Sequence, residues 1–292
     1  MLSISLRAFI VVLTVSVTHV SGTLYIIATP IGNLEDITAR AVRILGEVDL
    51  IACEDTRQTR KLLDRYGISK PLVSYHEHNE QPRSADLLRE LEAGKNIALV
   101  SDAGTPLIAD PGYRLVEHAR KIGIAVSPIP GPSALLAALS ASGLPTNSFS
   151  FHGFLPPKRG QRRKLLEVLR ASEATLVFYE APHRILDTLE DVDEILGPRP
   201  LVLARELTKI HEEFLRGTAA GLRETLGKRP SVKGEITLMI GKGETAQVDE
   251  TPLAEAVEKL VQSGVPKMEA LKTVARQRGL PKREVYKRLN EQ

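Results

Sequence analysis

The sequence predicts two consecutive α/β domains followed by a small helical unit. Short apolar segments alternate with amphipathic ones along most of the 292 residues, which is the pattern of strands and helices in α/β proteins. The length suits two domains with an appendage. Hydrophobic residues make up 42% and charged residues 26% of the chain, which is ordinary for folded proteins and excludes a chain that is disordered throughout.

The first domain is expected over residues 23–145, as an open, doubly wound parallel sheet. Its strands read TLYIIAT, LIAC, PLVSY, NIALVS and AVSPI. Strands this apolar are covered on both faces, and right-handed crossovers place the intervening helices there. The helices are expected to end near Gly46, Gly67, Gly94 and Gly123, because a glycine adopts positive φ without strain.

A helix expected from Pro132 to about Gly143 leads into the second α/β domain, residues 146–243. The strands expected there read SFSFHGF, ATLVFYEA, PLVLARE, HEEFLRG and GEITLMIG, with helices between some of them. Too few residues separate PLVLARE from HEEFLRG for a helical crossover. The second sheet is therefore expected to be mixed.

The composition changes after Gly243. The stretch GETAQVDETP indicates a linker, and three short helical patterns, LAEAVEKLVQS, KMEALKTVARQR and KREVYKRLNE, lie within residues 251–292. This segment carries nine Lys/Arg and five Asp/Glu, a net charge of +4, whereas the whole chain carries +3. Two helices joined by a glycine turn, then a third, resemble a helix-turn-helix unit that contacts nucleic acid. A small helical cap on the main body is the alternative.

Residues 1–22 have the outline of a signal peptide, with Arg7 before an apolar run over residues 8–17. The run is too short to span a bilayer. The single cysteine, Cys53, excludes an internal disulfide and indicates a reducing compartment, and the strand pattern begins at once at Thr23. We therefore expect a cytoplasmic protein without a membrane segment, and a start-site artefact in which translation begins at Val20.

Polar loops rich in glycine and proline follow all five strands of the first domain. They contain TPIGN, EDTR, HEHN, SDAGTP and PGPSA. In an open parallel sheet, ligands bind outside the carboxyl ends of the strands, and small residues there let the backbone approach a ligand closely. Turn formation alone would explain one or two such loops, whereas five on one edge predict a binding site.

The motifs that the sequence lacks narrow the class of site. No G-x-G-x-x-G follows a strand and no G-x-x-x-x-G-K-[ST] occurs, which disfavours dinucleotide and P-loop phosphate binding. PGPSA lacks the G-x-S-x-G elbow of hydrolases. His76 and His78 have no further ligands at zinc spacing, so no metal is expected. Cys53, at the end of an apolar strand, indicates packing and not a nucleophile.

Six motifs then carry a family resemblance: TPIGNLEDIT, ACEDTR, HEHN, SDAGTPLIADPG, PGPSA and YEAPHR, in this order. With them the chain resembles, from Thr23 to Lys242, the tetrapyrrole-methylase-like superfamily and, within it, the ribose 2′-O-methyltransferases of 16S rRNA. The resemblance implies an enzyme that binds S-adenosylmethionine in a cleft between the two α/β domains. It implies methylation of a cytidine ribose in the decoding region of 16S rRNA, with the small ribosomal subunit as partner, and leaves a homodimer open.

The resemblance also implies which residues bind the cofactor. Small residues at Ala103 and Gly104 give a ligand access to the backbone, and helix N–H groups beyond Pro132 suit the carboxylate of methionine. Asp102 has the alternative role of capping its own loop. The implied cofactor residues are Pro30, Asp102, Ala103, Gly104, Thr105, Ile108, Ser133, Ala134 and, from the second domain, Glu180.

Five cations stand within seven positions after a Pro-Pro turn: Lys158, Arg159, Arg162, Arg163 and Lys164. Cations at a helix N-terminus oppose the helix dipole, so another interaction is expected to stabilise them. We expect contacts with RNA phosphates. A solvated start of the helix is the alternative.

Glu54 and Asp55, at the end of a central strand, are candidates for positioning the substrate or for removing its proton. Capping of the helix that follows is the alternative role for both. Arg57, His76 and His183 are candidates on the substrate side by position alone.

Two other functions are open. The same fold could methylate a tetrapyrrole or another small molecule, but such a ligand needs neither the basic run nor the basic C-terminal segment. A non-catalytic RNA-binding factor of ribosome assembly is the second, but such a factor needs no cofactor loops such as SDAGTP and PGPSA. Both observations favour the RNA methyltransferase.

Overall fold

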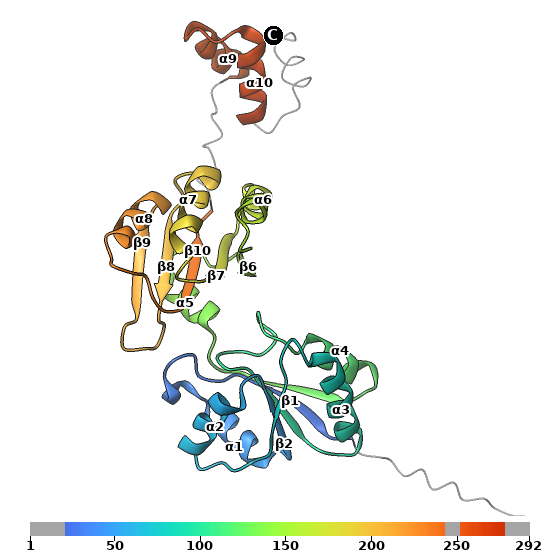
Figure 1. The fold of residues 1–292 in the computed structure, drawn as a ribbon. Coiled ribbons are helices and arrows are strands. Elements are labelled where there is room, and N and C mark those ends of the chain that lie inside the picture. Colours follow the sequence, from blue (N-terminus) through green and yellow to red (C-terminus); the bar gives the residue numbers. More distant parts are fainter. Residues whose placement is uncertain (1–20, 243–251, 278–292) are drawn as a thin grey trace, which may run out of the picture. The chain divides into compact units, whose positions relative to one another are not determined.

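The computed structural model of the chain describes residues 21–242 and 252–277. The chain divides into two compact units between Ala134 and Leu135, and each unit is described by itself (Figure 1). The expected boundary at residue 145 lies after the helix that begins at this division. Residues 1–20, the linker 243–251 and the third expected C-terminal helix lie outside the described residues. None of the helices in the described part is long and apolar enough to cross a membrane.

The first unit contains the five parallel strands that the sequence predicts. They are β1 (Thr23–Ile27), β2 (Leu50–Cys53), β3 (Leu72–Ser74), β4 (Ile97–Val100) and β5 (Ala125–Ile129). Every pair of neighbours is parallel, and the order across the sheet is β3-β2-β4-β1-β5. Its helices are η1 (Leu34–Asp36), α1 (Ala39–Glu47), α2 (Thr56–Arg65), α3 (Glu80–Glu92) and α4 (Tyr113–Lys121).

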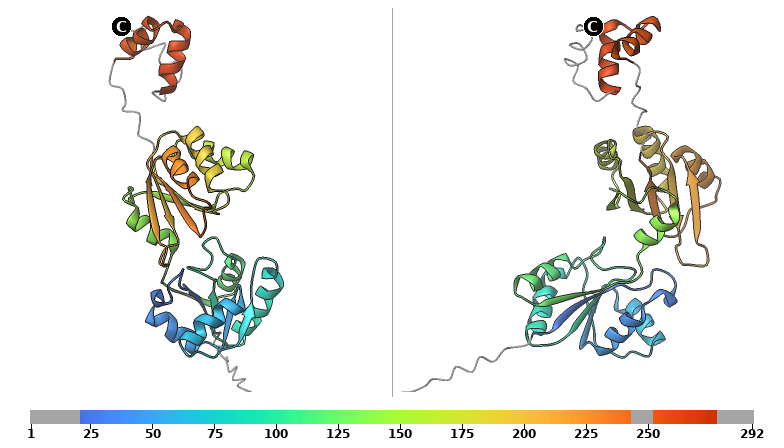
Figure 2. Two further views of the ribbon diagram at one scale, coloured as in Figure 1. Left: turned by 60° about the vertical axis from the view of Figure 1, so that its left-hand side comes forward. Right: turned by 180° about the vertical axis from the view of Figure 1, so that it is seen from behind.

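Helices cover both faces of this sheet, which confirms the doubly wound architecture (Figures 1 and 2). One apolar cluster joins the sheet to α1 and α2 through residues such as Leu45 and Leu63. The other cluster joins it to α3 and α4 through residues such as Leu91 and Leu115. Parallel strands that are buried on both faces account for the nearly continuous apolar runs in the sequence.

Three of the four predicted glycine stops are confirmed. Gly67, Gly94 and Gly123 follow their helices with φ of 65°, 93° and 82°. The first helix also ends near Gly46, at Glu47, but Gly46 lies inside α1 and is not a positive-φ stop.

The second unit contains a five-stranded mixed sheet, as the short connection predicts. Its strands are β6 (Phe149–Phe154), β7 (Thr175–Glu180), β8 (Leu201–Arg205), β9 (Glu213–Gly217) and β10 (Ile236–Ile240). The order is β6-β7-β10-β8-β9, in which only β6 and β7 are parallel. Its helices are α5 (Ala134–Ser142), α6 (Arg159–Leu169), α7 (Ile185–Leu196), α8 (Ala219–Gly227), α9 (Leu253–Gln262) and α10 (Lys267–Gln277).

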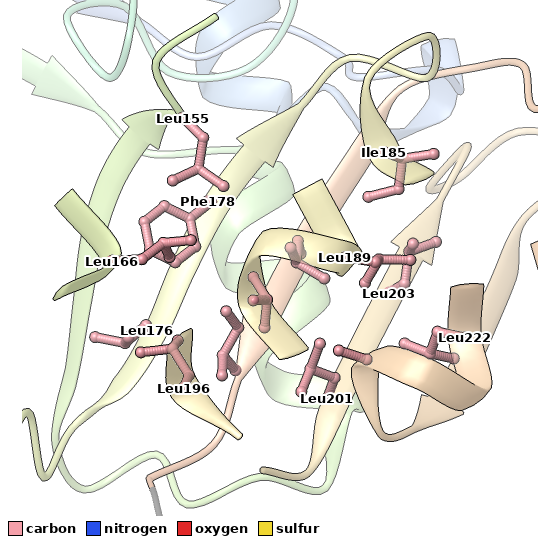
Figure 3. Packing of buried hydrophobic residues seen from close by; sticks show 14 of the residues in the cluster. Leu155, Leu166, Leu176, Phe178, Ile185, Leu189, Leu196, Leu201, Leu203 and Leu222 are labelled. Carbon is pink, nitrogen blue, oxygen red and sulfur yellow. The ribbon is translucent and has the colours of Figure 1, made fainter. Parts of the chain in front are cut away.

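One large apolar cluster joins this sheet to α6, α7 and α8. Leu166 of α6, Leu189 of α7 and Leu222 of α8 face Phe178 and Leu203 of the strands (Figure 3). The prediction that α5 starts at Pro132 is wrong by two residues, since the helix begins at Ala134.

The helices α9 and α10 are two of the three expected in the C-terminal segment. A turn at Gly264, with φ of 90°, joins them, and they bury a small apolar cluster that includes Val257 and Leu271. Two helices around a glycine turn are compatible with both readings of the segment, so its contact with nucleic acid stays a prediction.

Candidate functional site

The parallel strands of the first unit bring five loops to one edge of the sheet. The loops are residues 29–33, 54–57, 76–79, 101–106 and 130–134, and each follows one of the strands β1 to β5. Carboxyl ends of parallel strands lie at the same edge, so these loops surround one region. All the predicted cofactor residues of the first unit lie in or beside them.

The segment from Ser101 to Gly112 is held at both ends. Near its start, the backbone N–H groups of Thr29 and Gly104 each donate to the other's carbonyl oxygen, both at 2.9 Å. At its end, the Gly112 N–H donates to Glu80 Oε1 at 3.1 Å. These hydrogen bonds fix the segment against the loop after β1 and against α3.

The backbone inside this segment is strained. Leu107 and Ala109 have φ of 72° and 67°, in the left-handed region that residues other than glycine rarely adopt. Each such residue costs about 1–3 kcal/mol and persists only where its surroundings impose the conformation. Ile108, between them, is 40% exposed, and its contact with a ligand stays a prediction. Strain of this kind is typical of ligand-binding loops.

The predicted cofactor residues of the first unit differ in exposure. Pro30 and Gly104 are buried, whereas Asp102 and Ala103 are exposed. Gly104 has φ of 84°, which explains the choice of glycine there. Thr105 is half-buried, and its hydroxyl donates to the carbonyl oxygen of Pro132 at 3.2 Å, which ties the segment to the start of α5. Ser133 and Ala134, at that start, are also half-buried.

Asp102 binds the backbone of a neighbouring loop, whereas the alternative role in the sequence analysis was capping of its own loop. Its Oδ1 accepts a hydrogen bond from the backbone N–H of Asp55 at 2.9 Å, so it links the loops after β4 and β2. The residue as a whole is exposed. Asp102 therefore positions a neighbouring loop, and its contact with a ligand stays a prediction.

Asp55 also caps a helix. Its carboxylate accepts from the backbone N–H of Arg57 at 2.8 Å at the first turn of α2, and it pairs with the Arg57 guanidinium at 2.7 Å. Side-chain and backbone hydrogen bonds from Arg57 lower the pKa of Asp55 to about 2. A carboxylate with such a pKa is a weak proton acceptor at neutral pH. The structure therefore favours the capping role of Asp55 over a catalytic one.

The pKa values of Glu54 and Asp110 are raised, in contrast to the lowered pKa of Asp55. Burial raises the pKa of Glu54, and the carboxylates of Asp102 and Asp55 raise it further, while His76 opposes the shift. Burial and the neighbouring Glu54 raise the pKa of Asp110 to about 6, against a hydrogen bond from Ser101. The sequence motifs did not indicate Asp110 as a candidate site residue. It stands within SDAGTPLIADPG, but the motif does not reveal that its carboxylate is half-buried among other carboxylates.

His76 lies beside this cluster. Its backbone N–H donates to Asn79 Oδ1 at 2.9 Å, and its ring is 5.9 Å from that of His78. The ring nitrogen Nδ1 is buried and has no hydrogen-bond partner in the structure. Within the described ranges, no three His, Cys, Asp or Glu side chains are placed to hold a metal ion. Cys53 is buried, and burial raises the pKa of its thiol. Both observations agree with the predicted packing role of this residue.

Glu180 lies in the second unit, and its carboxylate is used within that unit. Oε1 accepts from the Ala181 N–H at 2.7 Å and from Arg184 at 2.6 Å, and Oε2 accepts from the Thr188 hydroxyl at 2.7 Å. The side chain has no exposed surface. A direct contact of this carboxylate with a cofactor is therefore disfavoured, because both oxygens are already bound.

The predicted phosphate contact is wrong for the buried Arg162, whereas for Arg159 and Arg163, whose side chains are 56% and 33% exposed, it stays a prediction. All three bind Asp191 of α7, whose side chain is 0% exposed, at 3.0, 2.7 and 3.0 Å. Arg162 is 3% exposed and cannot reach a phosphate. Arg163 also pairs with Glu194. Acidic side chains of α7 thus provide the interaction that was expected to stabilise the cations at the start of α6.

Lys158 and Lys164 remain as candidates for RNA contact. Both side chains are exposed, and neither forms an ion pair within the described residues. The two lysines flank the first turn of α6. His183 and Arg57 are also exposed, and their contact with a substrate stays a prediction.

Comparison with known proteins gives one family. The family model of tetrapyrrole (corrin/porphyrin) methylases matches residues 23–223. Ribosomal RNA small subunit methyltransferase I of Halalkalibacterium halodurans is 53% identical over 274 residues, which cover 91% of this chain and 93% of that protein. The proteins of the same name from Bacillus subtilis and Haemophilus influenzae are 46% and 48% identical, and cover 91% and 92% of this chain and 93% and 96% of their own.

Solved structures share the fold. Diphthine synthase superposes with a TM-score of 0.61 at 15% identity, covering 75% of this chain and 90% of its own. Uroporphyrin-III-C-methyltransferase of Thermus thermophilus gives a TM-score of 0.54 at 22% identity, covering 76% and 94%. At these identities the likeness concerns the fold alone.

Proposed function

We propose that this chain, which belongs to the tetrapyrrole (corrin/porphyrin) methylase family, transfers the methyl group of S-adenosylmethionine to small-subunit ribosomal RNA. As the acceptor we propose the ribose 2′-oxygen of a cytidine in the decoding region of 16S rRNA. Relatives at 46–53% identity bear the name ribosomal RNA small subunit methyltransferase I, which supports the ribosomal substrate. Such a substrate would place the protein in the cytoplasm.

The held and strained segment from Ser101 to Gly112 carries this proposal. A methyl donor with a sulfonium and an ammonium group needs close backbone contacts and negative charge, not a phosphate cradle. Gly104 and Ala103 supply accessible backbone, and Glu54 and Asp110 supply carboxylates. Neither carboxylate forms an ion pair in the described part of the chain, since Arg57 binds Asp55 and Arg114 faces Glu80. The residues present therefore fit S-adenosylmethionine.

The donor group supplies a methyl already activated by the positive sulfur. The protein's own residues then have three tasks. The loops after β1, β4 and β5, through Pro30, Gly104 and Ser133, hold and orient the ligand, and the N-terminus of α5 attracts its carboxylate. The same loops would have to hold the acceptor hydroxyl of the ribose within reach of the methyl group. A carboxylate at the same edge takes the hydroxyl proton, with Glu54 the remaining candidate of the two predicted. We propose no metal.

We propose that the RNA is contacted by Lys158, Lys164 and the basic C-terminal segment. Exposed lysines attract phosphates without reading sequence. A homodimer stays a prediction. The small-molecule methyltransferase is the second candidate function, because the family model that matches residues 23–223 is that of tetrapyrrole (corrin/porphyrin) methylases.

The test uses purified protein, methyl-labelled S-adenosylmethionine and small ribosomal subunits that lack the modification. We expect one methyl group per subunit, lost when a 2′-deoxycytidine replaces the target cytidine in a reconstituted subunit. Uroporphyrinogen serves as the competing substrate. Labelling of the tetrapyrrole alone would favour the second candidate, and labelling of neither would leave the non-catalytic assembly factor.

A further inference from the structure

We propose that an aromatic patch on the second unit, formed by Phe151, Phe154 and Tyr179, stacks against an unpaired base of the RNA substrate. The inference rests on the proposed methylation of ribosomal RNA and adds a surface that holds this RNA. Neither the sequence motifs nor the names of the relatives assign a function to these three residues.

Phenylalanine is scarce in this chain and is concentrated in one sheet. Of the six phenylalanines in the sequence, five lie in the strands β6, β7 and β9 of the second unit. Only Phe178 among these five faces the helices α6, α7 and α8 (Figure 3). The strand register places the other four on the opposite face of the sheet: Phe149, Phe151, Phe154 and Phe214. The core under these helices therefore does not account for most of the aromatic side chains.

A β-bulge brings Phe154 to this opposite face. Three residues lead from Phe151 to Phe154 on β6, whereas their partners on β7 are two residues apart. Gly153, inside the bulge, has φ of 63°, which glycine adopts without strain. In a regular strand Phe154 would face the helices, because successive side chains point to opposite faces. Leu155 packs there instead, beside Phe178 (Figure 3).

The bulge leaves the ring of Phe154 exposed. Phe154 is 57% exposed, whereas Leu155, the next residue, is 1% exposed. Tyr179 contacts both phenylalanines of the patch, with ring centroids 4.9 Å from Phe151 and 5.7 Å from Phe154. Both contacts are edge to face, at 67° and 62°, so the three rings do not stack on one another. The exposed ring of Phe154 thus has room to stack against a flat ligand.

The charges around the patch favour a nucleic acid as this ligand. Among the strand residues that the structure describes on this face, Arg216 of β9 is the one charged side chain, and no carboxylate occurs. Lys158 follows Phe154 by four positions, and its side chain is exposed. The acidic side chains described above lie on α7, which packs on the other face of the sheet. Aromatic rings with cations beside them suit the bases and the phosphates of RNA.

The nucleotide that binds here has to be unpaired. Bases in a duplex are stacked inside the helix, whereas those of single-stranded segments stack on phenylalanine and tyrosine side chains of proteins. In RNA-binding sheets of the RRM type, aromatic side chains on the sheet surface bind the bases in this way. A second copy of the chain is the competing occupant, because two identical patches could bury each other.

The first test measures binding of a short single-stranded RNA that contains the proposed target cytidine, and of the same RNA with abasic riboses. Phe154→Ala in the full chain is expected to weaken binding of the intact RNA about 5- to 150-fold, and Phe154→Tyr to restore it. Binding of the abasic RNA is expected to stay the same. Val168→Ala, at a side chain of α6 that is 73% exposed, is the control and is expected to change neither. Equal binding of the intact RNA by wild type and Phe154→Ala, or an equal loss with the abasic RNA, would overturn the proposal.

The salt dependence of the same binding separates stacking from charge. Phe154→Ala is expected to keep the log–log salt slope, because it removes no phosphate contact. Lys158→Ala is expected to reduce the slope by about 0.7, the value for one phosphate of a single strand. A slope that falls in Phe154→Ala as it does in Lys158→Ala would contradict stacking.

Sedimentation of the same variants tests the competing occupant. If Phe154→Ala turns a dimer into a monomer and leaves the RNA affinity unchanged, the patch belongs to an interface between two copies and the proposal is overturned. Calorimetry is expected to show equal binding of S-adenosylmethionine by wild type and Phe154→Ala. Wild-type protein that shows the expected pattern of RNA binding but methylates no rRNA would contradict the proposed function and not the stacking.

Discussion

The acidic partner of the α6 arginines gives a prediction whose size follows from the structure. Asp191 has a fully buried side chain, and its two oxygens bind Arg159, Arg162 and Arg163. Burial alone would raise the pKa of Asp191, but hydrogen bonds from Arg162, Arg163 and Arg159 outweigh it and lower the pKa. Replacing Asp191 with alanine removes this shared acceptor.

The expected loss comes mainly from Arg162. Arg159 and Arg163 keep partly exposed partners on α7, Glu190 and Glu194, and pairs near the surface contribute about 0–1 kcal/mol. Arg162 is left buried and unpaired, which costs about 3–5 kcal/mol. For a unit of this size, about 4 kcal/mol corresponds to a fall of roughly 8–16 °C in Tm.

The assay is thermal unfolding followed by circular dichroism. Asp193→Ala, an exposed aspartate on the same helix, is the matched control and is expected to change stability by less than about 0.5 kcal/mol. A combined Arg162→Met, Asp191→Leu variant is expected to recover most of the loss, because apolar residues replace a buried ion pair well. If Asp191→Ala unfolds within 1–2 °C of wild type, the arginines are not held by α7, and their contact with RNA phosphates regains support.

Three further predictions follow from the same geometry. Lys158→Ala with Lys164→Ala should reduce the log–log salt slope of RNA binding by about 1.4 if both contact single-stranded phosphates, and an unchanged slope would remove them from the interface. Gly104→Val should weaken S-adenosylmethionine binding about 10- to 100-fold, because valine is strained at φ of 84°, whereas Gly46→Ala, inside a helix, should bind normally. Asp110→Asn should raise Tm by about 2–4 °C at pH 7.5, since the ionised carboxylate costs about 1 kcal/mol after allowance for solvent screening. The folded-state pKa lies above the unfolded value of 3.8, so this cost grows as pH rises from 4 through 6, and equal Tm values at pH 7.5 would contradict it.

The strands could be predicted, and so could the parallel or mixed character of each sheet. Both depend on the local pattern of apolar and polar residues along the chain. Apolar runs of four to seven residues, each followed by a polar loop and an amphipathic helix, have one stable arrangement, a covered parallel sheet. The short connection between PLVLARE and HEEFLRG likewise has one solution, a hairpin of β8 and β9. Gly46 was misjudged because a glycine inside a helix looks the same in sequence as one that ends it.

The partners of charged side chains could not be predicted. Asp191 lies about thirty positions after the arginines that it binds, and nothing in the α6 sequence indicates it. The partners of Glu180 could not be predicted either. Its carboxylate accepts hydrogen bonds from Arg184 and Thr188, which the fold brings near it at the start of α7. The raised pKa of Asp110 could not be predicted for a related reason, since it depends on burial and on neighbouring charge, and neither is visible in the motif.

Ribose methylation of small-subunit rRNA can be measured in cells. A strain that lacks its own version of this methyltransferase is complemented with this chain, and nuclease fragments of its 16S rRNA are analysed by mass spectrometry. We expect complementation to add about 14 Da, one methyl group, to a cytidine ribose in the decoding region, with the base unmodified. A methyl group on a base, or no change in mass in the presence of folded protein, would contradict it.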